Sequence, residues 1–399
     1  MASISTFLRK SPVSALRAYF ETAAFDLPDT IDWEGEEADV MQPLLKAVNK
    51  MDEAEKGQFL LDAERVSTLA DEAGNTALLS VVKDQAIFAS LEVGHGCALW
   101  VFLNEPESFR KAEEVRYTDH RRHGRAWDGF VLAENCTVST DPIAIAAFTS
   151  AIRERCKTRN VEVDVFERQR HCHDGKTKKL IQVAVYREGR PGAALRFSDA
   201  GRLTRWVDTP VFEAALTYQP ESGAIEVTAD RKDTRLDLTK FMARDLLGQS
   251  FNEQRLPVLQ YDLSALLHPH KFDRDIVDGI ESVTVTALRL VADDDVPDRM
   301  TFEKSAFSDR TIWETFAHRF SGDNPLSGGH WSVVHAKIST KFGPSAAEPR
   351  GKTLALSITE PSGCNLKGLT AREQLISAKY LRRWGFLVDR DLMAVIDDA

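Results

Sequence analysis

Pairs of histidines in extended segments are the residues of this sequence that come nearest to metal chemistry. His171-Cys172-His173 lies between two predicted strands, and alternate residues of an extended segment project to one side. His171 and His173 could therefore share a zinc ion. The run around them is rich in Arg and Lys, supplies no further ligand at motif spacing and is typical of a solvated hairpin tip. We therefore expect no metal there, and the sequence identifies no cofactor.

A second constellation lies on the predicted strand that follows Gly328-Gly329. His335 and Lys337 share one face of it, and together with Asp323 they are faintly similar to the acid followed by acid-x-Lys of metal-dependent nucleases. A histidine in place of the second carboxylate weakens Mg²⁺ binding, which favours oxygen ligands. His330 stands an odd number of residues from His335, so a regular strand places the two on opposite faces unless a bulge intervenes.

A cysteine supplies the third candidate for chemistry. Cys364, in Pro361-Ser362-Gly363-Cys364-Asn365, follows a predicted strand and precedes a predicted helix, a position where nucleophiles are often displayed. His330 or His335 could act as its base. No family signature surrounds it, and an isolated cysteine is more often a small buried apolar group.

Two basic segments indicate a binding role instead. Lys and Arg beside aromatic residues suit phosphate contact and base stacking, although charge runs are usually solvated faces. The first segment is a predicted helix over 107–127, and the second runs from residue 153 to 179. The residues that we expect to contact nucleic acid are Arg110, Arg121, Arg122, Arg125, Lys178 and Lys179.

Composition narrows the class of protein. The formal net charge of −10 argues against a basic footprint over the whole surface. The five cysteines are scattered with no CxxC spacing, which indicates a reducing compartment, and we expect a cytoplasmic location. No apolar run approaches the roughly 18–20 residues of a membrane span. The first 20 residues contain three basic and no acidic side chains, so a transit peptide is the alternative to an ordinary first helix.

The elements that must position these residues follow from periodicity. Helical spacing and capping signals predict helices over 36–51, 52–73, 107–127, 141–156, 233–247, 311–319 and 370–384, with Gly74 ending the second of them. The segment 87–103 is a strand or a broken helix. Alternating patterns separated by short turns predict antiparallel strands over 161–165, 181–185, 194–197, 203–207, 212–218 and 224–228, and then over 283–291, 300–303, 331–341, 353–359 and 392–396.

The chain is therefore expected to be an α+β protein, with a helical N-terminal region and then two antiparallel sheet units covered by helices. We expect domains over 1–135, 136–270 and 271–399. The last helix either closes the preceding sheet, which is favoured, or belongs to a winged-helix unit.

Because each catalytic template fails on some point, we expect a non-catalytic binding component of a larger, bacterial-style intracellular assembly. It would contact protein, with nucleic acid as a further partner. The alternative is a hydrolase, either metal-dependent and nuclease-like around His335 and Lys337, or thiol-dependent through Cys364.

Overall fold

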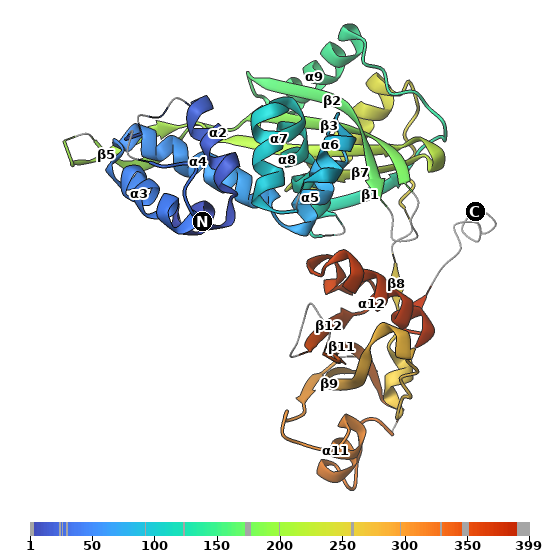
Figure 1. The fold of residues 1–399 in the computed structure, drawn as a ribbon. Coiled ribbons are helices and arrows are strands. Elements are labelled where there is room, and N and C mark those ends of the chain that lie inside the picture. The colour runs from blue at the N-terminus through green and yellow to red at the C-terminus, as the bar shows by residue number, and fades with distance from the viewer. Residues whose placement is uncertain are drawn as a thin grey trace. The chain divides into compact units, whose positions relative to one another are not determined.

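The computed structural model describes residues 4–23, 25, 27–28, 31–91, 93–122, 124–171, 177–198, 200–256, 259–295, 297–327, 329–344 and 351–388. The chain divides into two compact units, residues 1–256 and residues 257–399 (Figure 1). The expected boundary near 135 lies inside the first unit and stays a prediction.

The first unit begins with helices, as the sequence predicts. Their shared core is built from aromatic and aliphatic side chains such as Phe59, Tyr19 and Val66, all of them buried. The helices are α1 (Ile4–Lys10), α2 (Val13–Ala23), α3 (Glu37–Lys50), α4 (Glu53–Leu69), α5 (Glu72–Leu79), α6 (Gln85–Ser90), α7 (His95–Asn104) and α8 (Pro106–Arg121). The segment 87–103 is thus a broken helix rather than a strand.

A five-stranded antiparallel sheet completes this unit, in the order β1-β7-β6-β3-β2. Its strands are β1 (Trp127–Val131), β2 (Val161–His171), β3 (Thr177–Glu188), β6 (Val211–Gln219) and β7 (Ala224–Thr228). The intervening strands β4 (Gly192–Phe197) and β5 (Leu203–Asp208) leave this sheet and, among the described strands, pair with each other alone. The predicted antiparallel meander is confirmed, except that this pair forms a separate ribbon.

Helices cover both faces of the sheet (Figure 1). On one face lie α9 (Pro142–Cys156) and α10 (Lys232–Phe241), and α10 continues as a π-helical turn (Met242–Leu246). These helices form a core with Val183 and Val185 of β3. On the other face α8 is bonded to the sheet, because Gln182 Nε2 donates to Thr118 Oγ1 over 3.1 Å. Strand β3 is buried on both sides for this reason.

Two predicted helix ends are wrong. Helix α4 ends at Leu69, and Asp71 then caps a new helix, α5, by accepting a hydrogen bond from the Gly74 backbone N–H. Gly74 is needed for close packing rather than as a stop, since a Cβ there would lie 2.4 Å from the Leu69 Cα. Helix α8 ends at Arg121 instead of Trp127, which opens β1.

The second unit is built on another five-stranded antiparallel sheet, in the order β10-β9-β11-β12-β13. Helices α11 and α12 pack on it, and Phe316 and Trp384 are part of the shared core. The elements are β8 (Gln260–Tyr261), β9 (Ile280–Ala292), β10 (Arg299–Glu303), α11 (Ile312–Arg319), β11 (Trp331–Phe342), β12 (Lys352–Thr359), β13 (Gly363–Cys364), α12 (Ala371–Arg383) and β14 (Leu387–Val388).

The capping signals of the last helix are confirmed. The Thr370 side chain accepts from the Glu373 backbone N–H, and Glu373 accepts in return from the Thr370 backbone. After Gly385, β14 pairs with β8, and the expected strand over 392–396 lies outside the described residues. The α+β class is confirmed. Within the described part of the chain, no helix is both long and apolar enough to cross a membrane.

Candidate functional site

The ribbon formed by β4 and β5 is the feature of the first unit that is least explained by the fold itself. We refer to residues 190–210, which contain both strands, as the arm. Ala193 pairs with Val207, Leu195 with Arg205, and Phe197 with Leu203. Since directly paired residues of an antiparallel ribbon share a face, these six side chains form one face, which we call the apolar face of the arm.

The base and the tip of the arm are fixed by local chemistry. At the base the Gly189 backbone N–H donates to the Pro210 carbonyl over 2.7 Å, and the Phe212 ring lies against Gly189, where a Cβ would come within 2.5 Å of it. At the tip the Ser198 N–H donates to the Arg202 carbonyl over 2.9 Å, and Gly201 adopts φ +70°. The arm is therefore an ordered hairpin that continues strands β3 and β6.

The apolar face of the arm is open to solvent. The exposed fractions are 61% for Leu195, 75% for Phe197, 59% for Leu203 and 72% for Val207. Single exposed apolar residues are ordinary on protein surfaces, whereas a contiguous group usually marks a binding site. Four large apolar side chains on one face of a two-stranded ribbon make such a group.

The arm is also basic in an acidic chain. Residues 190–208 contain two aspartates and four arginines, although the whole chain carries −10. On the face opposite the apolar one, the Arg196 guanidinium lies 5.4 Å from the centre of the Trp206 ring. Among the described residues, no ion pair is formed by any of its arginines, which are Arg190, Arg196, Arg202 and Arg205.

Sequence reasoning placed both strands of the arm but missed its role. It assigned them to a continuous meander, in which one face of each strand would be buried. The signal against this was present in Gly189, Pro191 and Pro210, which flank the two strands. Proline lacks the N–H that a sheet ladder needs, so the ladder of the main sheet is interrupted there.

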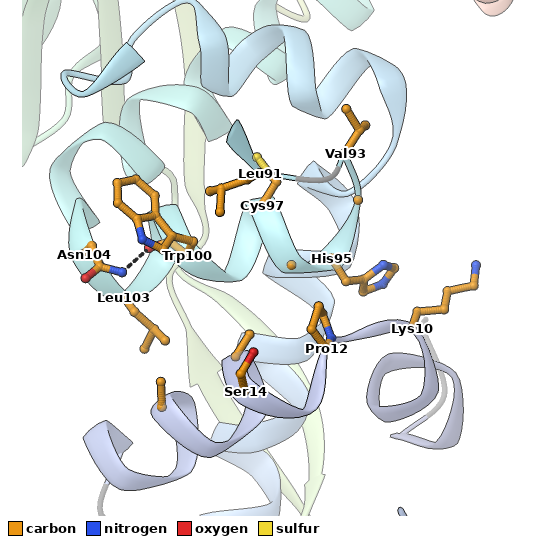
Figure 2. Close-up of a pocket in the computed structure, with 14 residues that line it drawn as sticks. Lys10, Pro12, Ser14, Leu91, Val93, His95, Cys97, Trp100, Leu103 and Asn104 are labelled. Atoms are coloured by element: carbon orange, nitrogen blue, oxygen red, sulfur yellow. Dashed lines mark hydrogen bonds between the residues drawn. The ribbon is translucent and has the colours of Figure 1, made fainter. Parts of the chain in front are cut away.

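A pocket of about 540 Å³ lies elsewhere in this unit, between α2 and α7 (Figure 2). Trp100 and Leu103 lie at one end of it, and His95 and Lys10 at the other. Helix α7 approaches the chain before α2 closely, because a Cβ on Gly96 would lie 2.8 Å from Pro12 Cγ. Most of the lining is apolar.

The polar groups of this pocket are poorly suited to nucleophilic catalysis. His95 Nε2 lies 3.2 Å from Ser67 Oγ, and burial together with the Lys10 charge lowers the pKa of the imidazole. Burial raises the pKa of the Cys97 thiol to about 11, and its Sγ lies 3.7 Å from Asn75 Oδ1. The thiol is therefore protonated at neutral pH, and a thiolate is the form that attacks. The pocket is suited to holding an apolar group.

The basic side chains predicted on α8 are directed to carboxylates of the same unit. Arg110 Nη2 lies 2.7 Å from Asp164 Oδ2, and Arg121 Nη1 lies 3.2 Å from Asp230 Oδ1 and stacks on the Tyr117 ring at 4.3 Å. These ion pairs connect α8 to the sheet and to the segment after β7. A phosphate would have to displace them.

The two basic segments meet at a charge network beneath α8. Arg122 and Arg170 both bind Glu226 of β7, at 2.6 and 3.1 Å, while Arg168 and Arg170 both bind Asp119 of α8. The arginines hold the pKa of Glu226 well below its usual value, although burial acts in the opposite direction. The network joins helix to sheet.

The remaining predicted nucleic-acid contacts are more accessible. Arg125 is exposed and follows α8, and Lys178 is half-buried opposite Arg170 in the β2–β3 register. Lys179 is exposed and pairs with Glu167 over 2.7 Å. These three cations, with Arg110, Arg121 and Arg122, do not form one uncompensated surface in the described part of the chain.

In the second unit, His335 contacts a serine that sequence reasoning did not single out. His335 Nε2 lies 3.0 Å from Ser357 Oγ on the neighbouring strand β12, and the Asn365 side chain accepts from the Ser357 backbone N–H over 2.8 Å. Burial and the charges of Arg289 and Lys337 lower the pKa of His335, so the imidazole is neutral at pH 7. The His335 Nδ1 is buried with no hydrogen-bond partner in the described chain.

Of the other residues of the predicted catalytic constellation, Lys337 is paired directly with Ser357 in the β11–β12 register, whereas His330 lies before β11. Strand β11 has a register shift between Val333 and His335. The bulge that His330 and His335 would need in order to face the same side is therefore present. His330 precedes the strand and is exposed, and Lys337 is exposed with Nζ 3.5 Å from Glu303.

The structure gives little support to Cys364 as a nucleophile or to His171 and His173 as a pair of metal ligands. Burial raises the pKa of Cys364, whose side chain is hydrogen-bonded with Tyr261. His171 ends β2, and His173 lies outside the described residues. Within the ranges that the structure describes, no three His, Cys, Asp or Glu side chains are grouped as metal ligands would be.

Comparison with known proteins gives no independent assignment. No protein-family model matches the chain, and no curated protein matches it.

Proposed function

We propose that this chain is a non-catalytic binding component of a larger intracellular assembly, and that it contacts a protein partner through the apolar face of the arm. The observation that carries the proposal is the exposure of Leu195, Phe197, Leu203 and Val207 on one face of an ordered ribbon.

Physical chemistry supports a partner for this face. A two-stranded hairpin is only marginally stable in water by itself, and exposed apolar side chains gain free energy when they are covered. Aromatic residues and arginine are enriched at protein interfaces, and the apolar face of the arm carries Phe197 and Arg205 together.

The test replaces Leu195, Phe197, Leu203 and Val207 with serine in the full-length chain, expressed at its native level in its own cells. Size fractionation of the native extract then separates assembled from free chain. We expect the natural chain to fractionate with a larger complex and the four-serine variant to fractionate as free protein.

A matched control changes exposed apolar residues elsewhere. Ile276 and Val277, in a turn of the second unit, are 97% and 94% exposed. Their replacement by serine should leave the complex intact. A four-serine variant that stays in the same complex would show that the proposed contact is wrong.

Nucleic acid remains the second predicted partner, through Arg110, Arg121, Arg122, Arg125, Lys178 and Lys179. A phosphate backbone needs cations that are free to approach it, and of these residues Arg125 is the exposed cation with no ion pair to a described acid. If nucleic acid binds, Arg125→Glu should weaken the binding of single-stranded DNA and RNA at low salt. Unchanged anisotropy titrations would remove this partner.

The alternative function is a hydrolase, and the contact between His335 and Ser357 favours it. A neutral imidazole 3.0 Å from a serine hydroxyl is the arrangement of a general base and a nucleophile. This alternative predicts that a fluorophosphonate probe labels the natural chain and fails to label Ser357→Ala at unchanged stability. The same test with a thiol-directed probe and Cys364→Ala addresses the thiol alternative.

A further inference from the structure

Helix α4 carries an exposed surface whose chemistry matches that of the arm. Phe59, Ala63 and Val66 face the core of the first unit and are buried. Leu60 and Leu61, in contrast, are 39% and 55% exposed. An amphipathic helix normally has polar residues on its outer side, so two leucines there require an explanation.

Acidic side chains flank these leucines. At 100° per residue, one outward arc of the helix contains Leu60, Leu61 and the acids Glu53 and Glu64. Both glutamates are exposed, and neither forms an ion pair with a described basic side chain. Gly57 lies within this arc, and space beside it is open, because a Cβ there would have no neighbour within 4 Å. We call these five residues the acidic face of α4.

We propose that the apolar face of the arm binds the acidic face of α4 on a second copy of this chain. Leu195, Phe197, Leu203 and Val207 then cover Leu60 and Leu61, and Arg205, which stands among them, faces the glutamates Glu53 and Glu64. This inference rests on the proposed function, since it names the partner of the arm.

The occupant is a second copy because both surfaces are open in a single copy. The exposed fractions of Phe197 and Leu61 are 75% and 55% within one chain, so the arm does not cover α4 of its own chain. The arm is basic and the exposed face of α4 is acidic, and both carry exposed apolar side chains. Complementary charges of this kind fix the register of a contact and disfavour other partners.

Symmetry follows from this pairing. Arm and α4 are different surfaces, so one contact alone would leave an open arm and an open helix at the ends of a growing chain. A two-fold arrangement closes both contacts at once. The inference is therefore a closed dimer in which each arm lies on the helix of its partner.

Reciprocal charge reversal tests the dimer. One variant changes Arg205, the arginine of the apolar face, to glutamate, and a second changes Glu53 and Glu64 to arginine. Each should dimerise roughly 100-fold more weakly than the natural chain in sedimentation equilibrium, since like charges then oppose each other. A control, Arg310→Glu with Arg319→Glu in the second unit, should dimerise like the natural chain.

Mixing the two variants gives the decisive result. In the mixed dimer each contact again joins unlike charges: a reversed arm meets a reversed helix, and a natural arm meets a natural helix. We expect the mixture to recover the dimer, which neither folding damage nor a different binding partner would produce.

Three outcomes would overturn the inference: a monomeric natural chain, reversals that leave the dimer unchanged, or a mixture that stays monomeric. These outcomes are distinct from failure of the proposed function. If the chain is monomeric and its four-serine arm variant still loses its native complex, the arm binds another protein and only the second copy is wrong.

Discussion

Leu195 and Arg205 occupy directly paired positions of the β4–β5 ribbon, so a guanidinium stands among four exposed apolar side chains. A partner must therefore cover these apolar side chains and place an acidic group against Arg205, near the centre of the contact. This combination is the basis of the proposed function. It is also why the acidic face of α4, defined above by Glu53, Gly57, Leu60, Leu61 and Glu64, is a suitable acceptor.

The first prediction concerns the stability of the arm variant. Because Leu195, Phe197, Leu203 and Val207 are mostly exposed, their replacement by serine removes little buried area and should change the free energy of unfolding by less than about 1 kcal/mol. Urea unfolding of the isolated natural and variant chains measures this at a concentration where both are monomeric. A loss of several kcal/mol would mean that the apolar face is buried within its own chain.

The second prediction concerns the charge network beneath α8. Glu226→Gln leaves Arg122 and Arg170 without their shared carboxylate in a buried site, which should cost about 3–5 kcal/mol. The folded-state pKa of Glu226 is depressed, so its contribution is present above the unfolded value and is lost as pH falls through the folded value. Urea unfolding at neutral pH should show the full effect, and a change below about 1 kcal/mol would contradict the network.

The third prediction concerns Glu114, a buried carboxylate on α8. Burial, with the nearby charge of Glu213, raises its pKa to about 7. The folded state therefore holds the proton more tightly than the unfolded state, and stability falls as pH rises from about 4.5 to about 7.

Glu114→Gln removes the free-energy cost of ionising this buried carboxyl group. The variant should be more stable than the natural chain by roughly 1–2 kcal/mol at pH 8 and equally stable near pH 4. Thermal unfolding across this pH range measures the difference, and a gain that does not depend on pH would refute the assignment.

The fourth prediction compares two glycines by adding one methyl group to each. Gly74→Ala places a Cβ 2.4 Å from the Leu69 Cα, so α5 must shift and the chain should lose about 1–3 kcal/mol of stability. Gly57→Ala adds a Cβ in open space inside α4 and should gain about 0.5–1 kcal/mol. Denaturant unfolding should show opposite signs, and equal effects would contradict the packing at α5.

The sequence predicted most of the regular elements because their signals are local. Pro142 after a capping Asp141 and the Thr370–Glu373 capping box set two helices correctly. Where a tertiary contact decided the outcome, the prediction failed. Gly74 was interpreted as a stop because sequence alone does not reveal its close approach to Leu69.

The candidate site was predictable only in part. Basic residues on and just after α8 are visible in the sequence, but their carboxylate partners lie in distant elements, and Glu226 follows its partner Arg122 by 104 residues. Similarly, strands β4 and β5 were visible, whereas their departure from the main sheet depends on the interruption at Gly189 and Pro210. Exposure of Phe197 and Leu203 is a consequence of that departure.

The most direct measurement is hydroxyl-radical footprinting of the chain in intact cells, with two phenylalanines compared within one molecule. Phe197 on the arm and Phe307 in the second unit are 75% and 97% exposed in the isolated chain. If the arm is covered by a partner, Phe197 should be modified several-fold less than Phe307 in cells and to a similar extent in the isolated monomer. Equal modification of the two residues in cells would contradict the proposal that the arm is a binding surface.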